Sequence, residues 1–252
     1  MKKVLSIMLI AVVAFTLSSC SGSKSATKTK ASKDGWVTIF DGTSFNGWRG
    51  YTKTGVPPKW TLQGDGTMKI NTPRNGREGQ EGGGDLLWDE KLKNFEFEIE
   101  WMSPVEGGGN GGIFYLAQEL PGKPIYTSAP EYQLGTNRVQ GQVTKTGPAS
   151  LFDIIGADPQ NAKPAGEWNK AKVVINNGNV QHWQNDVKVV EYKLWDQGWR
   201  DLLNSSKFSE KRWPEAFKYQ VEAGGPNREG YIGLQDHGLD IYFRNARLKK
   251  LP

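Results

Sequence analysis

Polar and apolar residues alternate in several short stretches of the chain, and this period-two pattern predicts β-strands. Residues 95–101 (FEFEIEW) are the clearest case, with apolar side chains on one face and acidic side chains on the other. Residues 172–175, 180–184, 187–192 and 241–244 are predicted as further strands, from β-branched and aromatic residues and flanking turn signals rather than from strict alternation. The pattern therefore predicts half-buried strands with one face turned to a core.

Turn-forming residues separate these strands. Residues 176–179 (NNGN) and 185–186 (ND) each link two predicted strands, as hairpin turns do. The one convincing helical stretch, residues 199–203 with a neighbourhood reaching 217, lies in a long insertion between strands. Strands and helices do not alternate repeatedly along the sequence, so a parallel α/β fold is not expected. We predict an all-β fold with a short helical insertion near 196–217.

The first 19 residues have the pattern of an export signal. Two lysines precede an apolar run over 4–17, which is too short to span a bilayer as a permanent helix. Residues 17–20 (LSSC) resemble a bacterial lipobox, in which the cysteine becomes the lipidated first residue. The alternative is an ordinary secretion signal with an incidental cysteine. Cys20 is the only cysteine, so no internal disulfide is expected. We predict a lipoprotein signal peptide over 1–19.

Residues 20–33 comprise the lipidated Cys20 and a stretch of Ser, Gly, Lys, Thr and Ala that is typical of a flexible tether. The tether lacks the acidic run associated with surface export. We therefore expect a lipid-anchored cell-envelope protein that faces the periplasm rather than the cell exterior. Its contact with the membrane is expected through the lipid anchor only.

Charge is divided unevenly between the tether and the remainder of the chain. Six of the 32 Lys and Arg residues and none of the 27 Asp and Glu residues lie in positions 1–33. Residues 34–252, 219 positions, keep 26 basic and 27 acidic residues, a net charge of −1. Nucleic-acid binding needs a clustered basic field on the domain, so no nucleic-acid partner is expected. The length suits one all-β sandwich or two small domains, and we predict one domain over 34–252.

Short motifs spread over this domain carry a resemblance to a known family. In chain order they are residues 36–42 (WVTIFDG) with 46–48 (NGW), 95–101 (FEFEIEW) with 110–113 (NGGI), 131–134 (EYQL), 164–169 (PAGEWN), 182–186 (HWQND), and 232–238 (IGLQDHG) with 243–245 (FRN). Each motif alone is weak, whereas their order and spacing together are specific. From residue 35 to the C-terminus the chain resembles the 3-keto-disaccharide hydrolase family. Residues 206–208 with 213–214 resemble an insertion seen in one branch of it.

This resemblance implies both a fold and a chemistry. The fold is a concanavalin A-like jelly-roll sandwich of two curved antiparallel sheets, with a concave face for sugars. The family acts on glycosides whose C3 hydroxyl has been oxidised to a ketone, which makes the C2 proton acidic. A base removes this proton, the aglycone leaves C1, and water then adds, so the net result is hydrolysis. Such a site needs a base, an acid and a group that stabilises the enolate, but not paired carboxylates around an oxocarbenium ion.

Two polar pairs in the matched motifs supply candidate groups. Because alternate side chains share one face of a strand, Glu131 points with Gln133, and Gln235 points with His237. The resemblance implies Glu131 and His237 as catalytic acid and base, or His237 as a metal ligand. Gln133 and Gln235 are the expected substrate-binding amides. The alternatives are a His237 that only closes the strand end through a loop carbonyl, and a buried ion pair between Glu131 and Arg244.

Four further residues are candidates for substrate binding: Asp236, Arg244, Asn110 and Tyr115. For Asn110 and its glycines the alternative is a tight turn. His182 lies beside a hairpin strand and is expected to be structural. The roles of the large aromatic residues stay open between core and sugar platform: Trp48, Trp88, Trp183 and Tyr115.

The residues after Gln133 depart from the family pattern. Relatives often continue with Leu-Asp-Asn and a nearby histidine, whereas this chain continues with Leu-Gly-Thr-Asn and has no histidine before His182. Closely spaced His or Cys ligands are absent from the sequence, and Asp153 is the one candidate substitute. No cofactor is therefore assigned, and a divalent metal with unknown ligands stays open.

Two functions follow from these observations. Retained Glu131 and His237 favour an enzyme that cleaves 3-keto-disaccharides or 3-keto-glucosides by C2 proton abstraction. The departure after Gln133 favours a non-catalytic, lipid-anchored glycan-binding protein on the same scaffold. Both hypotheses predict a carbohydrate as the ligand.

Overall fold

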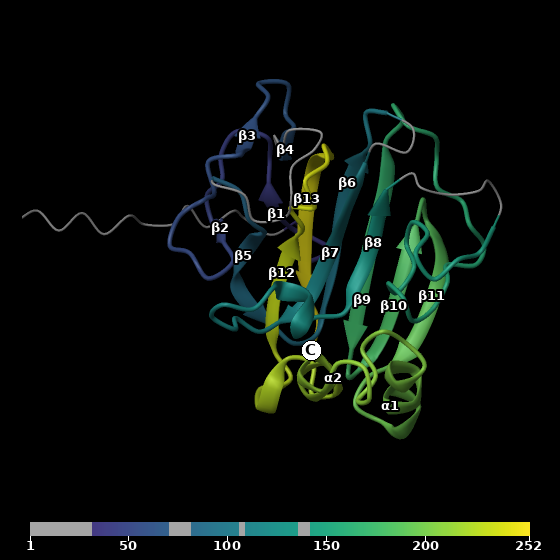
Figure 1. Ribbon diagram of the computed structural model, residues 1–252. Helices are drawn as coiled ribbons and strands as arrows, with labels where there is room; N and C mark the ends of the chain where they lie inside the picture. Colours follow the sequence, from purple (N-terminus) through teal and green to yellow (C-terminus); the bar gives the residue numbers. More distant parts are fainter. Residues whose placement is uncertain (1–31, 71–81, 106–108, 136–141) are drawn as a thin grey trace, which may run out of the picture.

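Two antiparallel sheets face one another in the computed structural model, which describes residues 32–70, 82–105, 109–135 and 142–252 (Figure 1). The eight-stranded sheet has the order β11-β10-β9-β6-β13-β4-β3, with β1 also paired to β13. Its strands are β1 (Val37–Phe40), β3 (Trp60–Leu62), β4 (Met68–Ile70), β6 (Phe95–Met102), β9 (Asn169–Asn176), β10 (Asn179–Gln184), β11 (Val187–Lys193) and β13 (Tyr242–Lys250). The five-stranded sheet has the order β2-β5-β12-β7-β8. Its strands are β2 (Trp48–Gly50), β5 (Leu86–Leu92), β7 (Asn110–Ala117), β8 (Glu131–Gly135) and β12 (Gly230–Leu234). The predicted all-β sandwich is confirmed.

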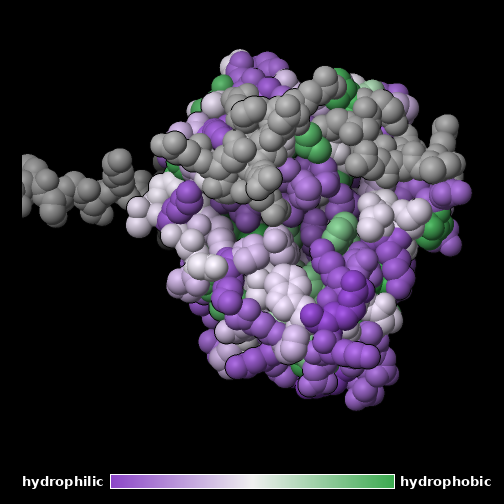
Figure 2. Space-filling view, viewed as in Figure 1, coloured by the Kyte–Doolittle hydropathy of each residue, from purple (hydrophilic) through white to green (hydrophobic). Residues whose placement is uncertain are grey.

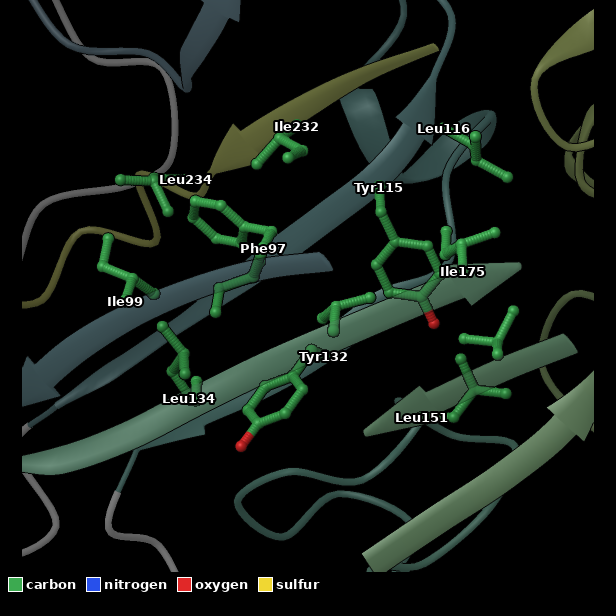
Figure 3. Close-up of a cluster of buried hydrophobic side chains, with 14 of the residues drawn as sticks. Phe97, Ile99, Tyr115, Leu116, Tyr132, Leu134, Leu151, Ile175, Ile232 and Leu234 are labelled. Atoms are coloured by element: carbon green, nitrogen blue, oxygen red, sulfur yellow. The ribbon is translucent and has the colours of Figure 1, made fainter. Parts of the chain in front are cut away.

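Strand β6 shows how the alternating pattern builds the core. Buried and half-buried residues alternate along all eight of its positions. Its apolar side chains, Phe97 and Ile99 among them, meet Tyr132 and Ile232 from the five-stranded sheet (Figure 3). Burying a large apolar side chain stabilises the fold by about 1.5–3 kcal/mol. The hydrophobic effect therefore decides which face of each strand turns inward.

The acidic face of β6 lies outside the sandwich, against basic residues of β13. Three ion pairs join the strands: Glu96 with Lys249, Glu98 with Arg247, and Glu100 with Arg244. Arg244 Nε lies 2.6 Å from Glu100 Oε2, and the guanidinium lies 4.0 Å from the centroid of the Trp168 ring. The alternative of a buried ion pair between Glu131 and Arg244 is therefore wrong, because the partners of Arg244 lie on the outer face of the eight-stranded sheet.

Both predicted hairpins are confirmed. Asn177 and Gly178 have φ angles of 48° and 81°, and Asn185 and Asp186 have φ angles of 49° and 66°. Positive φ at both central residues is the mark of a type I′ turn, whose twist matches that of the flanking strands. Asn, Asp and Gly enter this left-handed region at low cost, so these dipeptides connect β9 to β10 and β10 to β11.

The predicted helical insertion consists of two helices, α1 (Gln197–Asn204) and α2 (Pro214–Val221), and so extends a little past residue 217. Asp196 caps α1, since its Oδ1 accepts a hydrogen bond from Trp199 N at 2.9 Å. Both helices lie at one end of the sandwich (Figure 1). Helix α2 is joined to the short 3₁₀ turn η1 (Ile125–Thr127) by a 2.9 Å hydrogen bond from Gln220 Nε2 to Tyr126 O. A second 3₁₀ turn, η2 (Gly225–Asn227), precedes β12.

The predicted signal peptide over 1–19, Cys20 and most of the tether lie outside the described residues and stay predictions. No helix in the described ranges is long and apolar enough to cross a membrane. On the face shown in Figure 2, hydrophobic residues lie scattered among hydrophilic ones.

Candidate active site

A pocket of about 350 Å³ opens on the outer side of the five-stranded sheet. Its nine lining residues are Asn110, Tyr126, Glu131, Gln133, Phe152, Lys207, Trp213, Gln235 and His237. The expected convergence of two polar pairs, one after η1 and one near the C-terminus, is therefore observed.

Strand β8 directs the first polar pair into the pocket. Glu131 and Gln133 line it, while Tyr132 and Leu134, which alternate with them along the strand, belong to the core. The edge of β8 is paired with a neighbouring loop: Phe152 N donates to Glu131 O at 3.0 Å, and Ala149 N donates to Gln133 O at 2.8 Å. Both backbone positions are thus held from the side as well as by β7.

A glycine beneath Glu131 makes room for its carboxylate. A Cβ added at Gly112 would lie 2.4 Å from Glu131 Oε1, closer than real contacts allow. Gly112 is part of β7, which pairs with β8. The Glu131 side chain therefore lies flat across the neighbouring strand, and only 6% of the residue is exposed.

The second polar pair was expected on a strand, but β12 ends at Leu234, the residue before Gln235. Gln235 N still donates to Gly112 O at 2.9 Å, so the extended course continues and Gln235 and His237 line the same pocket. Asp236 points the other way and is 1% exposed. Its carboxylate accepts hydrogen bonds from Gly84 N at 2.8 Å and Gly238 N at 3.1 Å. Asp236 is therefore a structural residue in this fold, not a pocket residue.

Asn110 connects the two pairs. Its Oδ1 accepts a hydrogen bond from Gln133 Nε2 at 2.8 Å, and its Nδ2 lies 3.3 Å from both ring nitrogens of His237. Asn110 is the first residue of β7, so the alternative of a tight turn is wrong for this residue. The side chains of Gln133, Asn110 and His237 form a continuous polar row along one side of the pocket.

Four lining residues were not expected from sequence: Tyr126, Phe152, Lys207 and Trp213. Lys207 and Trp213 come from the insertion between β11 and β12. The sequence feature that could have indicated them is the insertion motif at 206–208 and 213–214. Tyr126 and Trp213 pack edge to face, with ring centroids 5.9 Å apart and an interplanar angle of 68°. Aromatic rings thus line the pocket together with the polar row, the usual composition of a small-molecule site.

Tyr115 lies in the core instead of the pocket. It is fully buried, and its hydroxyl lies 2.8 Å from His182 Nε2 and 2.7 Å from the Tyr192 hydroxyl. Burial raises the pKa of Tyr115 and lowers the pKa of His182 to about 4, so both are neutral at pH 7. His182 Nδ1 lies 2.9 Å from Ala149 O, to which it donates in the neutral ring. His182 is structural as expected, and Tyr115 is not placed to contact a sugar.

The tryptophans considered as sugar platforms do not line the pocket. Trp48 is buried and packs edge to face against Trp88, with ring centroids 5.6 Å apart. Trp183 lies on β10 with the Lys172 ammonium 4.5 Å from its ring centroid. The tryptophan in the pocket is Trp213.

The described residues do not fit a metal site. No three His, Cys, Asp or Glu side chains gather within the described ranges. Asp153, the candidate substitute, does not line the pocket, and its Oδ2 accepts a hydrogen bond from Lys207 N at 2.6 Å.

Two facing antiparallel sheets, with a polar and aromatic pocket on the outer side of the smaller one, place the chain in the class of concanavalin A-like sandwich domains. Within this class the chain belongs to the family of 3-keto-alpha-glucoside-1,2-lyase-like domains, whose sequence profile matches residues 35–249. The resemblance drawn from the motifs is confirmed.

Relatives extend over most of the chain. The 3-keto-disaccharide hydrolase of Bacteroides thetaiotaomicron is 53% identical over 233 residues, covering 86% of this chain and 79% of its own. A solved structure of a candidate glycosyl hydrolase from Parabacteroides distasonis has a TM-score of 0.69 at 26% identity, over 87% of this chain and 95% of that one. A second candidate glycosyl hydrolase from that organism, at 20% identity and a TM-score of 0.57 over 81% and 99% of the two chains, shares the fold.

Proposed function

We propose that this protein cleaves 3-keto-disaccharides and related 3-keto-glycosides in the pocket around Glu131 and His237. The observation that carries the proposal is the convergence of this carboxylate and this imidazole with three side-chain amides in one pocket. The family to which the chain belongs and the name of the 53% identical relative support the same substrate class.

The chemistry follows from the ketone. A carbonyl at C3 makes the C2 proton acidic, because the negative charge left behind is delocalised onto the C3 oxygen. In the proposed reaction Glu131 takes this proton, and the electron pair passes into an enolate. The enolate then collapses, the bond between C1 and the glycosidic oxygen breaks, and protonated His237 gives its proton to the departing oxygen.

Addition of water completes the cycle. Water attacks C1 of the enone and passes a proton to His237, while Glu131 returns a proton to C2. One water is consumed, one glycosidic bond is cleaved, and the sugar keeps its C3 ketone. Both side chains regain their starting protonation states, so no co-reactant other than water is required.

The composition of the pocket favours this route over direct glycoside hydrolysis. Direct hydrolysis uses two carboxyl groups on either side of the scissile bond. Among the described residues that line the pocket, Glu131 is the one carboxylate. The amides of Gln133, Gln235 and Asn110 match the hydrogen-bonding pattern of sugar hydroxyls.

Aglycone release from a matched pair of substrates tests the proposal. The purified protein should release the aglycone from a 3-keto-glucoside and leave the unoxidised glucoside intact, because the latter has no acidic C2 proton. Glu131→Gln and His237→Ala should each lower turnover on the order of a hundred- to ten-thousand-fold, with circular dichroism unchanged. Glu191→Gln, at an exposed residue of β11, is the matched control and should retain full turnover.

The same assay discriminates the other outcomes. Equal release from both substrates would exclude the elimination mechanism. Release from neither, together with measurable sugar binding, would support the non-catalytic glycan-binding protein.

A further inference from the structure

Elimination from a 3-keto sugar places negative charge on the C3 oxygen, and the roles assigned to Glu131 and His237 leave that charge unbalanced. Resting on the proposed function, we infer that Lys207 is a further catalytic residue, whose ammonium donates a hydrogen bond to the C3 oxygen and stabilises the enolate. Lys207 lines the same pocket as Glu131 and His237. It is the one lysine or arginine among the described residues that do so.

Aromatic rings surround the Lys207 ammonium. Nζ lies 4.2 Å from the ring centroid of Phe152, 4.9 Å from that of Phe208 and 5.7 Å from that of Tyr126. Aromatic faces attract a cation through the ring quadrupole. A fixed cation stabilises a developing anion far better in a site that excludes water than in solution. Lys207 is half-buried, and its side chain lies among these rings in the same pocket as Glu131 and His237.

The backbone around Lys207 is held in place from both sides. Lys207 N donates to Asp153 Oδ2 at 2.6 Å. Ser206 Oγ donates to Leu203 O at 2.7 Å and accepts from Phe208 N at 3.0 Å. Ser206 and Phe208 are both buried. A charge that is held in place in this way can act without reorganisation during the reaction. Asp153 is therefore a positioning residue, because it fixes the backbone of Lys207.

In this assignment the proton balance of the reaction is unchanged. Glu131 takes the C2 proton, the electron pair moves onto the C3 oxygen opposite Lys207, and Lys207 keeps its own proton throughout. When the C1 bond breaks, the pair returns and restores the ketone. Lys207 therefore acts only on the charged intermediate and the transition states that flank it, and its loss should lower kcat rather than raise KM.

The test compares Lys207→Met with Lys211→Met, a control at an exposed lysine of the same insertion. With a 3-keto-glucoside as substrate, Lys207→Met should lower kcat on the order of a hundred- to a thousand-fold, with KM within about threefold of wild type. The kinetic isotope effect from C2-deuterated substrate should increase, because proton abstraction becomes the slower step. Lys211→Met should match wild type in all three quantities.

Two further variants keep the test decisive if Lys207→Met folds poorly. Lys207→Arg keeps a cation with altered geometry and should retain part of the activity. Asp153→Ala removes the oxygen that accepts the Lys207 N–H, and it should give a smaller loss in kcat than Lys207→Met together with an increase in isotope effect, because the ammonium is displaced but present. A Lys207→Met enzyme with near wild-type kcat, or with a loss confined to KM, overturns the assignment. Wild-type protein that releases no aglycone from any 3-keto-glycoside would overturn the proposed function itself.

Discussion

Replacing Gly112 with alanine should disable Glu131 while leaving the fold in place. A Cβ at Gly112 would lie 2.4 Å from Glu131 Oε1, 2.7 Å from Cγ and 2.8 Å from Cδ. Contacts below 3.0 Å are essentially never seen for real Cβ atoms, and Cγ is not the free end of the side chain. The whole Glu131 side chain must therefore move.

The magnitude follows from these distances. Ordinary van der Waals contact begins at 3.4 Å, so the carboxylate oxygen must retreat by about 1 Å. Misplacing a reacting group by about 1 Å costs on the order of a hundredfold in rate, which corresponds to about 2.7 kcal/mol of transition-state free energy. Overpacking costs roughly 1–3 kcal/mol of stability, which a domain stable by about 5–15 kcal/mol survives.

The assay is aglycone release from a 3-keto-glucoside, with thermal unfolding measured in parallel. Gly111→Ala is the matched control, because its Cβ would meet Ile241 Cδ1 at 3.0 Å, at the flexible end of a core side chain, instead of Glu131. Wild-type turnover in Gly112→Ala would refute the placement of Glu131 as the base. An equal loss in both variants would point to distortion of β7 rather than to displacement of the carboxylate.

Three further predictions concern the core and the N-terminus. Tyr115→Phe removes a buried hydroxyl that is hydrogen-bonded to His182. The free energy of unfolding should fall by about 1–3 kcal/mol, while KM stays unchanged. A raised KM at wild-type thermal stability would instead place Tyr115 in the sugar site. The pKa of His182 is about 4 in the fold against 6.5 ordinarily, so its contribution to stability is present above pH 6.5 and is lost as pH falls towards 4. Urea unfolding should show a loss of about 2 kcal/mol from this group between pH 7 and pH 5, absent in His182→Gln, and an equal loss in both proteins would contradict the argument. We also propose that Cys20 carries lipid; Cys20→Ala, expressed in a bacterial host and fractionated, should leave the membrane fraction, and a variant that still pellets like wild type would exclude the anchor.

Strand faces and hairpin turns were predictable because both depend on neighbouring residues alone. The alternation in β6 assigns Phe97 inward and Glu98 outward, and burial of the apolar face enforces it. The turns at 177–178 and 185–186 need residues that tolerate positive φ, a requirement of local sterics. The pairing of Glu131 with Gln133 on one face follows from the same alternation.

Alternation also explains where the predictions for the site went wrong. It correctly sets Asp236 opposite Gln235 and His237, and this face is the one that binds backbone amides inside the protein. Tyr115 likewise lies on the inward face of β7, where His182 and Tyr192 approach it from the other sheet. A motif match indicates that a residue matters, but it does not distinguish a ligand contact from a core hydrogen bond.

Which segments complete the pocket depends on the packing of the whole fold. Three segments contribute the lining residues that were not expected: η1, a loop beside β8 and the helical insertion, which supply Tyr126, Phe152, Lys207 and Trp213. The local sequence of each segment does not indicate which other segments it contacts. The partner of Arg244 was set in the same way, by the register of β13 against β6. By itself the sequence determined the inward and outward faces, the turns and the family, because these depend on short-range sterics and apolar periodicity. The composition of the pocket depends on contacts between distant segments, which form only when the two sheets and the insertion pack together.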